Sequence, residues 1–227
     1  MTLRSAPNPV RTAKGDGMRA ATHVLWLFVL SVAVAACAPG EQAAEDEAGA
    51  NGAEETVGDA EAAGAALQDA EGNEVGEVTF TQRDDVVVVD AVLDAPDLAH
   101  GFHGFHVHEA GVCEADAPEG PFTTAGGHFN PEGETHSDHA GDMPSLYVTE
   151  DGTAELTFAV DRFEVADLTA EGGEDGTAVI VHADRDNFGH IPDRYESTET
   201  GESGPDEDTR NTGDAGDRAL CGVVEPA

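Results

Sequence analysis

The sequence predicts an all-β protein, built as a sandwich or barrel of short strands. Runs rich in β-branched residues recur along the chain with Gly, Pro and Asp clusters between them, a pattern typical of short strands joined by turns. Glycine is abundant, at 27 of 227 residues, and only 5% of the residues are aromatic. No long helical pattern and no Gly-rich nucleotide loop are found. The predicted strands cover Val78–Thr81, Val86–Leu93, Phe102–His108, Ser145–Thr149, Ala154–Val160 and Ala178–His182.

The folded domain is predicted over residues 67–227, which is long enough for a real core. The formal charge of the chain is −37, and after Cys37 there are 46 acidic residues against six arginines and no lysine. A surface this acidic excludes nucleic acid as a partner, because phosphate binding needs a basic face. Such a surface stays hydrated in concentrated salt, so we expect a salt-loving source. The alternative, an acidic tail on an ordinary protein, fits less well because the acids run through the whole chain.

The pattern of residues 1–37 predicts that the protein is exported. From Met18 the chain has a basic start, an apolar run and small residues before Cys37, as in a secretory signal. The apolar run is too short to favour a spanning helix, which needs about 20 apolar residues. The ending Val-Ala-Ala-Cys resembles the lipobox of bacterial lipoproteins, which predicts lipidation at Cys37 and a cell-membrane lipoprotein facing the outside or the periplasm. A plain signal peptide cut nearby is the alternative, and either Met1 or Met18 can be the true start.

Residues 38–66 form an Ala/Glu/Gly run without apolar periodicity. Such a segment cannot bury enough surface to fold. We therefore expect a disordered acidic tether, extended by its own charge, that holds the domain away from the membrane.

Two cysteines, Cys113 and Cys221, remain after Cys37. An even pair in an exported protein indicates a disulfide, and two free buried thiols are the alternative. A bond that closes a loop of about a hundred residues stabilises by about 4–5 kcal/mol in the chain-entropy view. It would tie the segment after the histidine-bearing strand to the C-terminal strand.

Histidine is concentrated in one part of the chain, with seven of ten between His100 and His139. His106 and His108 alternate in a predicted strand, so both side chains point to the same face. His182 ends an apolar run and can come from a neighbouring strand. Because imidazoles suit copper or zinc rather than calcium or magnesium, these three residues predict a transition-metal site.

A second cluster lies in a stretch rich in Gly and Pro, and it contains His128, His136, His139 and Asp142. Three histidines with one aspartate can make a closed four-ligand zinc site. The His-x-x-His pair alone is weak evidence for a metal. With His128 before it and Asp142 after it, the indication is much stronger.

Five motifs, in order between about Leu67 and Val224, resemble those of the copper/zinc superoxide dismutases. The resemblance implies a Greek-key β-sandwich or barrel of about eight antiparallel strands with long metal-binding loops. The motifs are Gly104-Phe105-His106-Val107-His108-Glu109, Gly127-His128-Phe129-Asn130-Pro131, His139-Ala140-Gly141-Asp142, Val181-His182-Ala183-Asp184 and Gly213-Asp214-Ala215-Gly216-Asp217-Arg218-Ala219-Leu220-Cys221-Gly222.

The resemblance implies a role for each site residue. Arg218 would be the active-site arginine over copper, Asp186 the carboxylate that links ligands of both metals, and Cys113–Cys221 the disulfide. A surface ion pair is the alternative for Arg218. The implied copper ligands are His106, His108, His128 and His182, and the implied zinc ligands are His128, which bridges the metals, His136, His139 and Asp142.

The implied reaction is dismutation of superoxide to oxygen and hydrogen peroxide, which would protect the cell exterior. His128 would carry a proton to the peroxide, and Arg218 would offer a fixed positive charge to a small anion. Since 1 M salt shortens the screening length to about 3 Å, we expect weak long-range steering of the substrate. The oligomeric state stays open, with a homodimer among the options.

The chain departs from the family pattern in two places. Only two residues separate His136 from His139, where most members have a longer zinc subloop. Between Phe188 and Arg210 an acidic stretch without lysine replaces the usual charged guiding loop. The zinc site is therefore less firmly predicted than the copper site.

Three histidines match no ligand position. We expect a structural hydrogen bond for His103 and solvated turns for His100 and His190. Two rival functions stay open at this point. One is a noncatalytic copper-binding or carrier lipoprotein on the same fold, although inactive members usually lack a copper ligand or the arginine. The other is a purely structural β-sandwich, which leaves the clustered histidines without a cause.

Overall fold

The computed structural model describes residues 61–169, 176–198 and 200–227. The predicted signal segment 1–37, the choice between Met1 and Met18, the lipidation at Cys37 and the tether up to residue 60 lie outside these residues. In the described ranges, no helix is long and apolar enough to cross a membrane.

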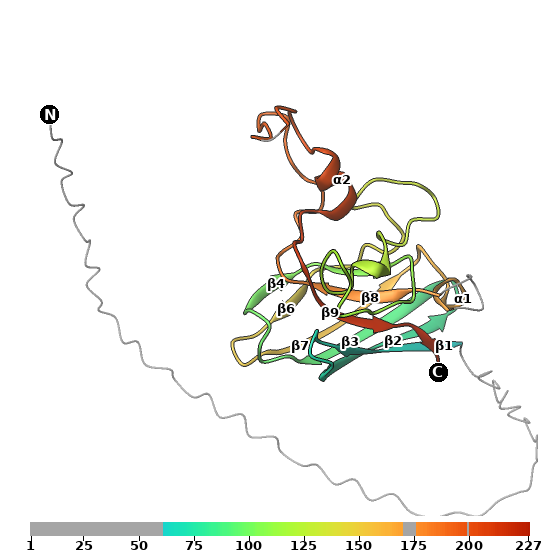
Figure 1. Cartoon of the computed structure of the whole chain (residues 1–227). Helices are drawn as coiled ribbons and strands as arrows, with labels where there is room; N and C mark the ends of the chain where they lie inside the picture. The colour runs from blue at the N-terminus through green and yellow to red at the C-terminus, as the bar shows by residue number, and fades with distance from the viewer. Residues whose placement is uncertain (1–60, 170–175, 199) are drawn as a thin grey trace, which may run out of the picture. The chain divides into compact units, whose positions relative to one another are not determined.

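An antiparallel sheet that curls into a half-barrel forms the body of the domain (Figure 1). Its order is β5-β8-β9-β1-β2-β3-β7, with β10 beside β1, and a smaller sheet joins β4 and β6. Neighbours distant in sequence, such as β5 and β8, confirm the predicted all-β Greek-key class. The strands of the described ranges are β1 (Ala62–Gln68), β2 (Glu74–Arg83), β3 (Val86–Asp94), β4 (Gly101–His103), β5 (Phe105–His108), β6 (Leu146–Val148), β7 (Thr153–Val160), β8 (Ala178–His182), β9 (Arg218–Val223) and β10 (Glu225–Pro226).

Alternation of buried and exposed side chains builds the core. In β3, Val87, Val89, Ala91 and Leu93 are buried at every second position, because successive residues of a strand face opposite sides. β2 and β7 pair with β3 on its two sides. Phe80 of β2 is fully buried among these residues.

The first strand begins before the predicted domain boundary. β1 starts at Ala62, within the predicted tether, and pairs with β2 and β9. Ala63 and Ala65 are buried. The boundary at Leu67 is therefore wrong, because small residues such as Ala and Gly carry little strand signal even where they pack inside a sheet.

The predicted strand Phe102–His108 is in fact two strands, separated at Gly104. The Gly104 N–H donates to the carbonyl of Asp184, and the Gly104 carbonyl accepts from the N–H of His182. β4 then pairs with β6, whereas β5 pairs with β8. This change of partner brings the histidines of β5 into the main sheet.

Short helices lie in the connections, namely η1 (Thr123–Ala125), α1 (Val165–Leu168) and α2 (Glu207–Thr212). Figure 1 shows α2 standing away from the strands, at the end of the acidic stretch that follows Phe188. The side chain of Asp206 caps its N-terminus by accepting from the Thr209 N–H. Gly213 ends it in a left-handed conformation.

Candidate metal centre

Four buried imidazoles meet beside β5 and β8. We call His106, His108, His128 and His182 the first group. Each offers one ring nitrogen, and these four atoms lie within 4.8 Å of one another. The structure thus brings together all four residues predicted to bind copper.

Strand pairing places three of these residues. His106 and His108 lie on β5, which pairs antiparallel with β8, and His182 is the last residue of β8. All residues of both strands are buried. Because two adjacent strands have one register, the three imidazoles need no loop to reach one another.

His103 holds the end of β8 in place. Its Nδ1 lies 2.8 Å from the carbonyl oxygen of His182, and its Nε2 lies 2.6 Å from the carbonyl oxygen of Ala99. This confirms the structural hydrogen bonding predicted for His103. His100 and His190 are exposed, as predicted.

Two imidazoles of the first group are fixed through their outer nitrogens. Nδ1 of His108 is 3.0 Å from the carbonyl oxygen of Gly126, and Nδ1 of His182 is 3.0 Å from that of Gly216. Their Nε2 atoms face each other at 3.4 Å. A ring held on one side with its other nitrogen turned inward is the usual arrangement of a metal-binding histidine.

The second group consists of the residues predicted to bind zinc, His128, His136, His139 and Asp142, and all four are buried. Oδ1 of Asp142 lies 2.7 Å from Nδ1 of His128, and Oδ2 lies 3.0 Å from Nδ1 of His136. Nδ1 of His139 lies 3.3 Å from both Nδ1 of His128 and Oδ2 of Asp142. His106 also lies close to this group, since it offers a ring nitrogen within 4.8 Å of atoms of His128, His136 and Asp142.

Backbone hydrogen bonds attach part of the second group to β5. The N–H of Val107 donates to the Gly141 carbonyl at 2.9 Å, and the Val107 carbonyl accepts from the Phe129 N–H at 2.8 Å. These bonds put His128 and Asp142 in bridge pairs with β5. The other two residues of the group lie in the turn between them, outside this ladder.

Asp186 links the two groups, as predicted for it. Its Oδ2 lies 2.7 Å from Nε2 of His106, and its Oδ1 lies 2.8 Å from Nε2 of His136. Oδ1 also accepts from the N–H of Phe188. The Nδ1 atoms of His106 and His136 are both buried without a hydrogen bond. Nδ1 of His136 lies 3.0 Å from Oδ2 of Asp142, but this contact lacks hydrogen-bond geometry.

Burial and charge act differently on the two groups. Burial lowers the pKa of His182 to about 3 and that of His106 to about 4, and it lowers the pKa of His108 well below its usual value. Burial also disfavours the charged form of His136, but the two carboxylates that contact its ring, Asp142 and Asp186, outweigh it and raise the pKa to about 9. At neutral pH the metal-free protein therefore keeps these first-group rings neutral and His136 protonated.

The donor atoms fit copper and zinc. Nitrogens bound about 2.0–2.1 Å from a tetrahedral zinc ion lie about 3.3–3.4 Å apart. The facing nitrogens of the first group are 3.4 Å apart and those of the second 3.3 Å. A bound ion would also give a partner to the buried Nδ1 atoms of His106 and His136. Imidazoles with one carboxylate do not suit calcium or magnesium.

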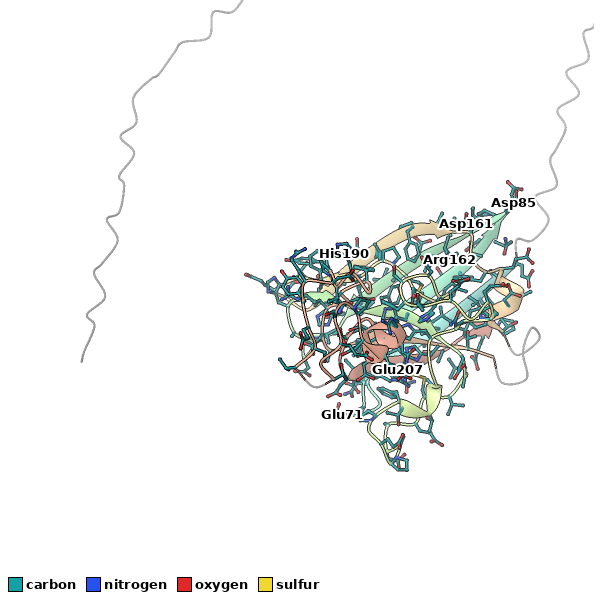
Figure 2. All side chains as sticks on the ribbon, turned by 90° about the horizontal axis from the view of Figure 1, so that it is seen from above. Glu71, Asp85, Asp161, Arg162, His190 and Glu207 are labelled. Carbon is teal, nitrogen blue, oxygen red and sulfur yellow. A yellow bond between two sulfur atoms is a disulfide. The ribbon has the colours of Figure 1, made fainter. Side chains whose placement is uncertain are left out.

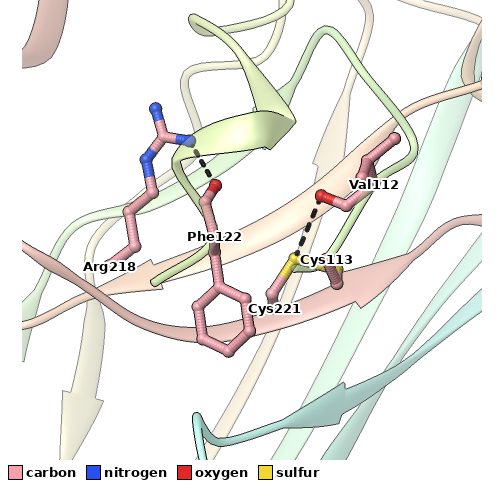
Figure 3. The surroundings of a disulfide bond; sticks show 5 residues. All are labelled: Val112, Cys113, Phe122, Arg218 and Cys221. Carbon is pink, nitrogen blue, oxygen red and sulfur yellow. Dashed lines mark hydrogen bonds between the residues drawn. A yellow bond between two sulfur atoms is a disulfide. The ribbon is translucent and has the colours of Figure 1, made fainter. Parts of the chain in front are cut away.

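Arg218, at the start of β9, lines a cavity of about 550 Å³ together with three residues of the first group. Its guanidinium donates to the carbonyl of Phe122 at 2.6 Å (Figure 3). It also donates to the carbonyl of Gly126. The surface ion pair considered as an alternative is not formed with any residue that the structure describes. The arginine is held by backbone oxygens and borders the same space as the imidazoles.

Cys113 and Cys221 form the predicted disulfide. Cys221 lies in β9, and Cys113 lies in the loop before η1 (Figure 3). The bond attaches this loop to β9, and the residues on the two sides of η1, Phe122 before it and Gly126 after it, supply carbonyls to the site. Through those carbonyls it supports both Arg218 and the first group.

Several groups that hold the site were missed by sequence reasoning. Backbone carbonyls such as that of Gly216 cannot be recognised from residue types. Arg162 was also missed, although its guanidinium reaches the carbonyls of Ser137 and Asp142. The one sequence signal that pointed to Arg162 was the scarcity of cationic residues, since the domain has only six arginines.

Comparison with known proteins agrees with this centre. The family model described as copper/zinc superoxide dismutase matches residues 74–224. A protein named superoxide dismutase [Cu-Zn] from Mycolicibacterium paratuberculosis is 47% identical over 134 residues, which are 56% of this chain and 57% of that protein. Proteins of the same name from Mycobacterium bovis and Mycobacterium tuberculosis are each 44% identical over 133 residues, covering 56% of this chain and 54% of theirs.

The matched part spans little more than half the length of those curated relatives. Among solved structures, one titled as the clock protein EA4 aligns with a TM-score of 0.53 and 31% identity. The alignment covers 74% of this chain and 95% of that one. It supports the same β-fold.

Proposed function

Because the chain belongs to the copper/zinc superoxide dismutase family, we propose that it converts two superoxide ions and two protons into oxygen and hydrogen peroxide. The observation that carries the proposal is one imidazole, His128, shared by two buried groups beside a cavity that Arg218 lines. In this proposal the first group holds copper and the second group holds zinc.

The chain's own residues bind the anion and move a proton. Copper held by the first group would supply a redox couple able to exchange single electrons with superoxide. Arg218 offers positive charge and N–H donors to a small anion in the cavity, and two carbonyls already hold its guanidinium. Nδ1 of His128 faces Asp142 at 2.7 Å. Its Nε2 is therefore the atom that takes up a proton and passes it to the peroxide.

Attraction of the substrate is proposed to be short-ranged. Asp208 and Asp214 line the same cavity as Arg218, so the field at its mouth is mixed. Salt mutes exposed carboxylates, because the screening length is about 3 Å at 1 M. Dismutation rates should change little with salt while the fold stays intact. Rates that rise several-fold as salt is lowered would point instead to strong attractive steering.

Metal analysis combined with a dismutation assay tests the proposal. The full chain should contain copper and zinc and remove superoxide. His182→Ala should lose copper and activity, while His190→Ala, which changes an exposed histidine outside both groups, should retain both. Stoichiometric copper in an inactive wild-type protein would reject the enzyme and favour the copper carrier.

We further propose that the protein is exported and anchored to the membrane through a lipid on Cys37, facing the outside or the periplasm. The disulfide supports export, because such bonds persist in oxidising compartments. Labelling with a fatty-acid probe should mark the wild-type protein and not Cys37→Ala, which should leave the membrane fraction. An unlabelled wild-type protein in the soluble fraction would contradict the anchor.

We also propose that two copies associate through the outer face of the β4–β6 sheet. Phe102 is 59% and Tyr147 45% exposed, with their rings 4.9 Å apart. Two of the six arginines of the domain, Arg162 and Arg185, line the pocket beside Phe102. They reduce the repulsion that two acidic copies would feel elsewhere on their surfaces.

Light scattering after size-exclusion chromatography tests this association. Wild type should have the mass of a dimer and Phe102→Asp that of a monomer. Val92→Asp, at an equally exposed apolar residue on β3, should stay a dimer. A monomeric wild-type protein would reject the proposal.

A further inference from the structure

We propose that Arg162 is a positioning residue of the second group, which braces the short loop between His136 and Asp142 in the shape that binds zinc. The inference rests on the proposed zinc binding and adds a residue that belongs to none of the motifs above. Arg162 lies just after β7, 25 positions from Ser137 and 20 positions from Asp142 in sequence. Figure 2 labels it beside Asp161.

The guanidinium of Arg162 reaches two backbone carbonyls of this loop. Nη1 donates to the Ser137 carbonyl at 3.1 Å, and Nη2 donates to the Asp142 carbonyl. Ser137 directly follows His136, and Asp142 is itself a member of the group. One rigid, planar cation therefore holds the loop at both ends of the segment that contains His139.

Between Ser137 and Ala140 the other backbone hydrogen bonds of this loop are local. Residues 136–141 form only turns and bends, and all of them are buried except Ser137 and Asp138. The His136 N–H donates to the carbonyl of Arg210, and the His139 N–H donates to Oδ2 of Asp142. Holding two buried imidazoles in so short a turn, without strand or helix hydrogen bonding, costs conformational entropy. A brace that fixes the turn before the metal arrives reduces that cost.

The rival interpretation is that Arg162 only moderates the negative charge of the domain. Arg185 separates the two interpretations, because it lines the same pocket as Arg162 and is also exposed. No hydrogen bond or ion pair of the Arg185 side chain is found among the residues that the structure describes. Arg185→Met therefore removes the same charge from the same pocket and leaves the brace intact.

Zinc titration of the full chain provides the test. The metal-free wild type, Arg162→Met, Arg162→Lys and Arg185→Met are titrated with Zn²⁺ against a competing chelator. Arg162→Met should bind zinc about 10–100-fold more weakly, the usual effect of losing a group that orients metal ligands. Arg162→Lys should fall between it and wild type, because an ammonium is a point charge and cannot span two carbonyls as a planar fork does. Arg185→Met should match wild type.

A second readout reports geometry rather than stability. With Co²⁺ in place of zinc, the visible spectrum should change in Arg162→Met and stay unchanged in Arg185→Met, and the Cu²⁺ affinity of the first group should stay within a few-fold. If Arg162→Met does not fold, the intermediate affinity and altered spectrum of Arg162→Lys decide.

Three results would overturn the inference. Equal zinc affinity and spectrum in wild type and Arg162→Met would reject the role of Arg162 and leave the proposed zinc site standing. Equal weakening in Arg162→Met and Arg185→Met would show a charge effect. A wild-type protein that binds no zinc would reject the proposed zinc site, and the brace with it.

Discussion

The two metal groups differ in how the chain holds them. In the first group, His106, His108 and His182 lie on the paired strands β5 and β8, and the ladder sets their spacing. In the second group, His136 and His139 lie in an irregular turn outside the strand ladder and depend on side chains from elsewhere, namely Asp186 and Arg162. Ligands on strands are positioned when the sheet forms, whereas ligands on a loop need separate supports.

Charge follows the same division. Buried imidazoles on the strands are neutral without metal, since the pKa of His182 is about 3 and that of His106 about 4. His136, between two aspartates, holds a proton because its pKa is about 9. The first group is thus ready to bind a cation at neutral pH, and the second must first release a proton.

The largest expected effect comes from removing the disulfide. This bond supports residues around the first group and none of the second-group loop. Replacing Cys113 and Cys221 together by Ser should lower the free energy of unfolding by about 4–5 kcal/mol, since the bond closes a loop with a sequence separation of 108. Urea unfolding of the metal-free protein measures this. Copper affinity should fall more than zinc affinity, because the loop supplies carbonyls to His108 and Arg218. An equal fall in both affinities would break the division between the groups.

Asp186→Asn removes the link between the groups. The amide nitrogen of Asn cannot accept a hydrogen bond, so one of the two histidines loses its partner. We expect zinc affinity to fall about 10–100-fold and copper affinity to fall less, because a strand also holds His106. Asp184→Asn, at an exposed carboxylate two residues away, is the control. Competitive metal titrations that find copper affected more than zinc would contradict this ranking.

Gly213→Ala tests the support that comes from the end of α2. Gly213 has a φ of 61°, and a Cβ there would clash with Oδ1 of Asp186 and Nε2 of His136. Gly72 also has a positive φ, 81°, with open space around it. Both substitutions should cost about 1 kcal/mol of backbone strain. Only Gly213→Ala should also weaken zinc binding, and equal zinc affinities in the two variants would reject the contact.

The pH dependence of metal binding sharpens the electrostatic contrast. Zinc must displace the proton of His136, so its apparent affinity should rise about tenfold per pH unit up to pH 9 and then level off. His106 and His182 are already deprotonated above about pH 5, since their pKa values are about 4 and about 3. They should therefore add no pH dependence to the copper affinity above that pH. Parallel slopes for the two metals would contradict the contrast.

The same proton affects the stability of the metal-free protein. The pKa of His136 is raised from 6.5 to about 9 on folding, so its contribution is fully present below pH 6.5 and is lost as the pH rises through 9. His136→Gln should reduce that loss of stability. Thermal unfolding between pH 6 and 10 measures it.

Sequence reasoning predicted the strands that carry β-branched residues, such as Val86–Leu93, and missed β1, whose Ala and Gly residues resemble those of the preceding tether. It also found the residues of both groups, because histidine is a rare and chemically specific residue type. The supports were not predictable. The carbonyl of Gly126 and the reach of Arg162 depend on how distant segments meet, and residue types do not record this.

The most direct test of the central claim is anomalous diffraction from crystals of the full chain loaded with both metals. Data collected at the copper and zinc absorption edges should show two separate peaks on opposite sides of His128. Copper should lie against Nδ1 of His106 and Nε2 of His182, and zinc against Nδ1 of His136 and the carboxylate of Asp142. A single peak, or both metals mixed at both positions, would contradict two distinct sites that share one imidazole.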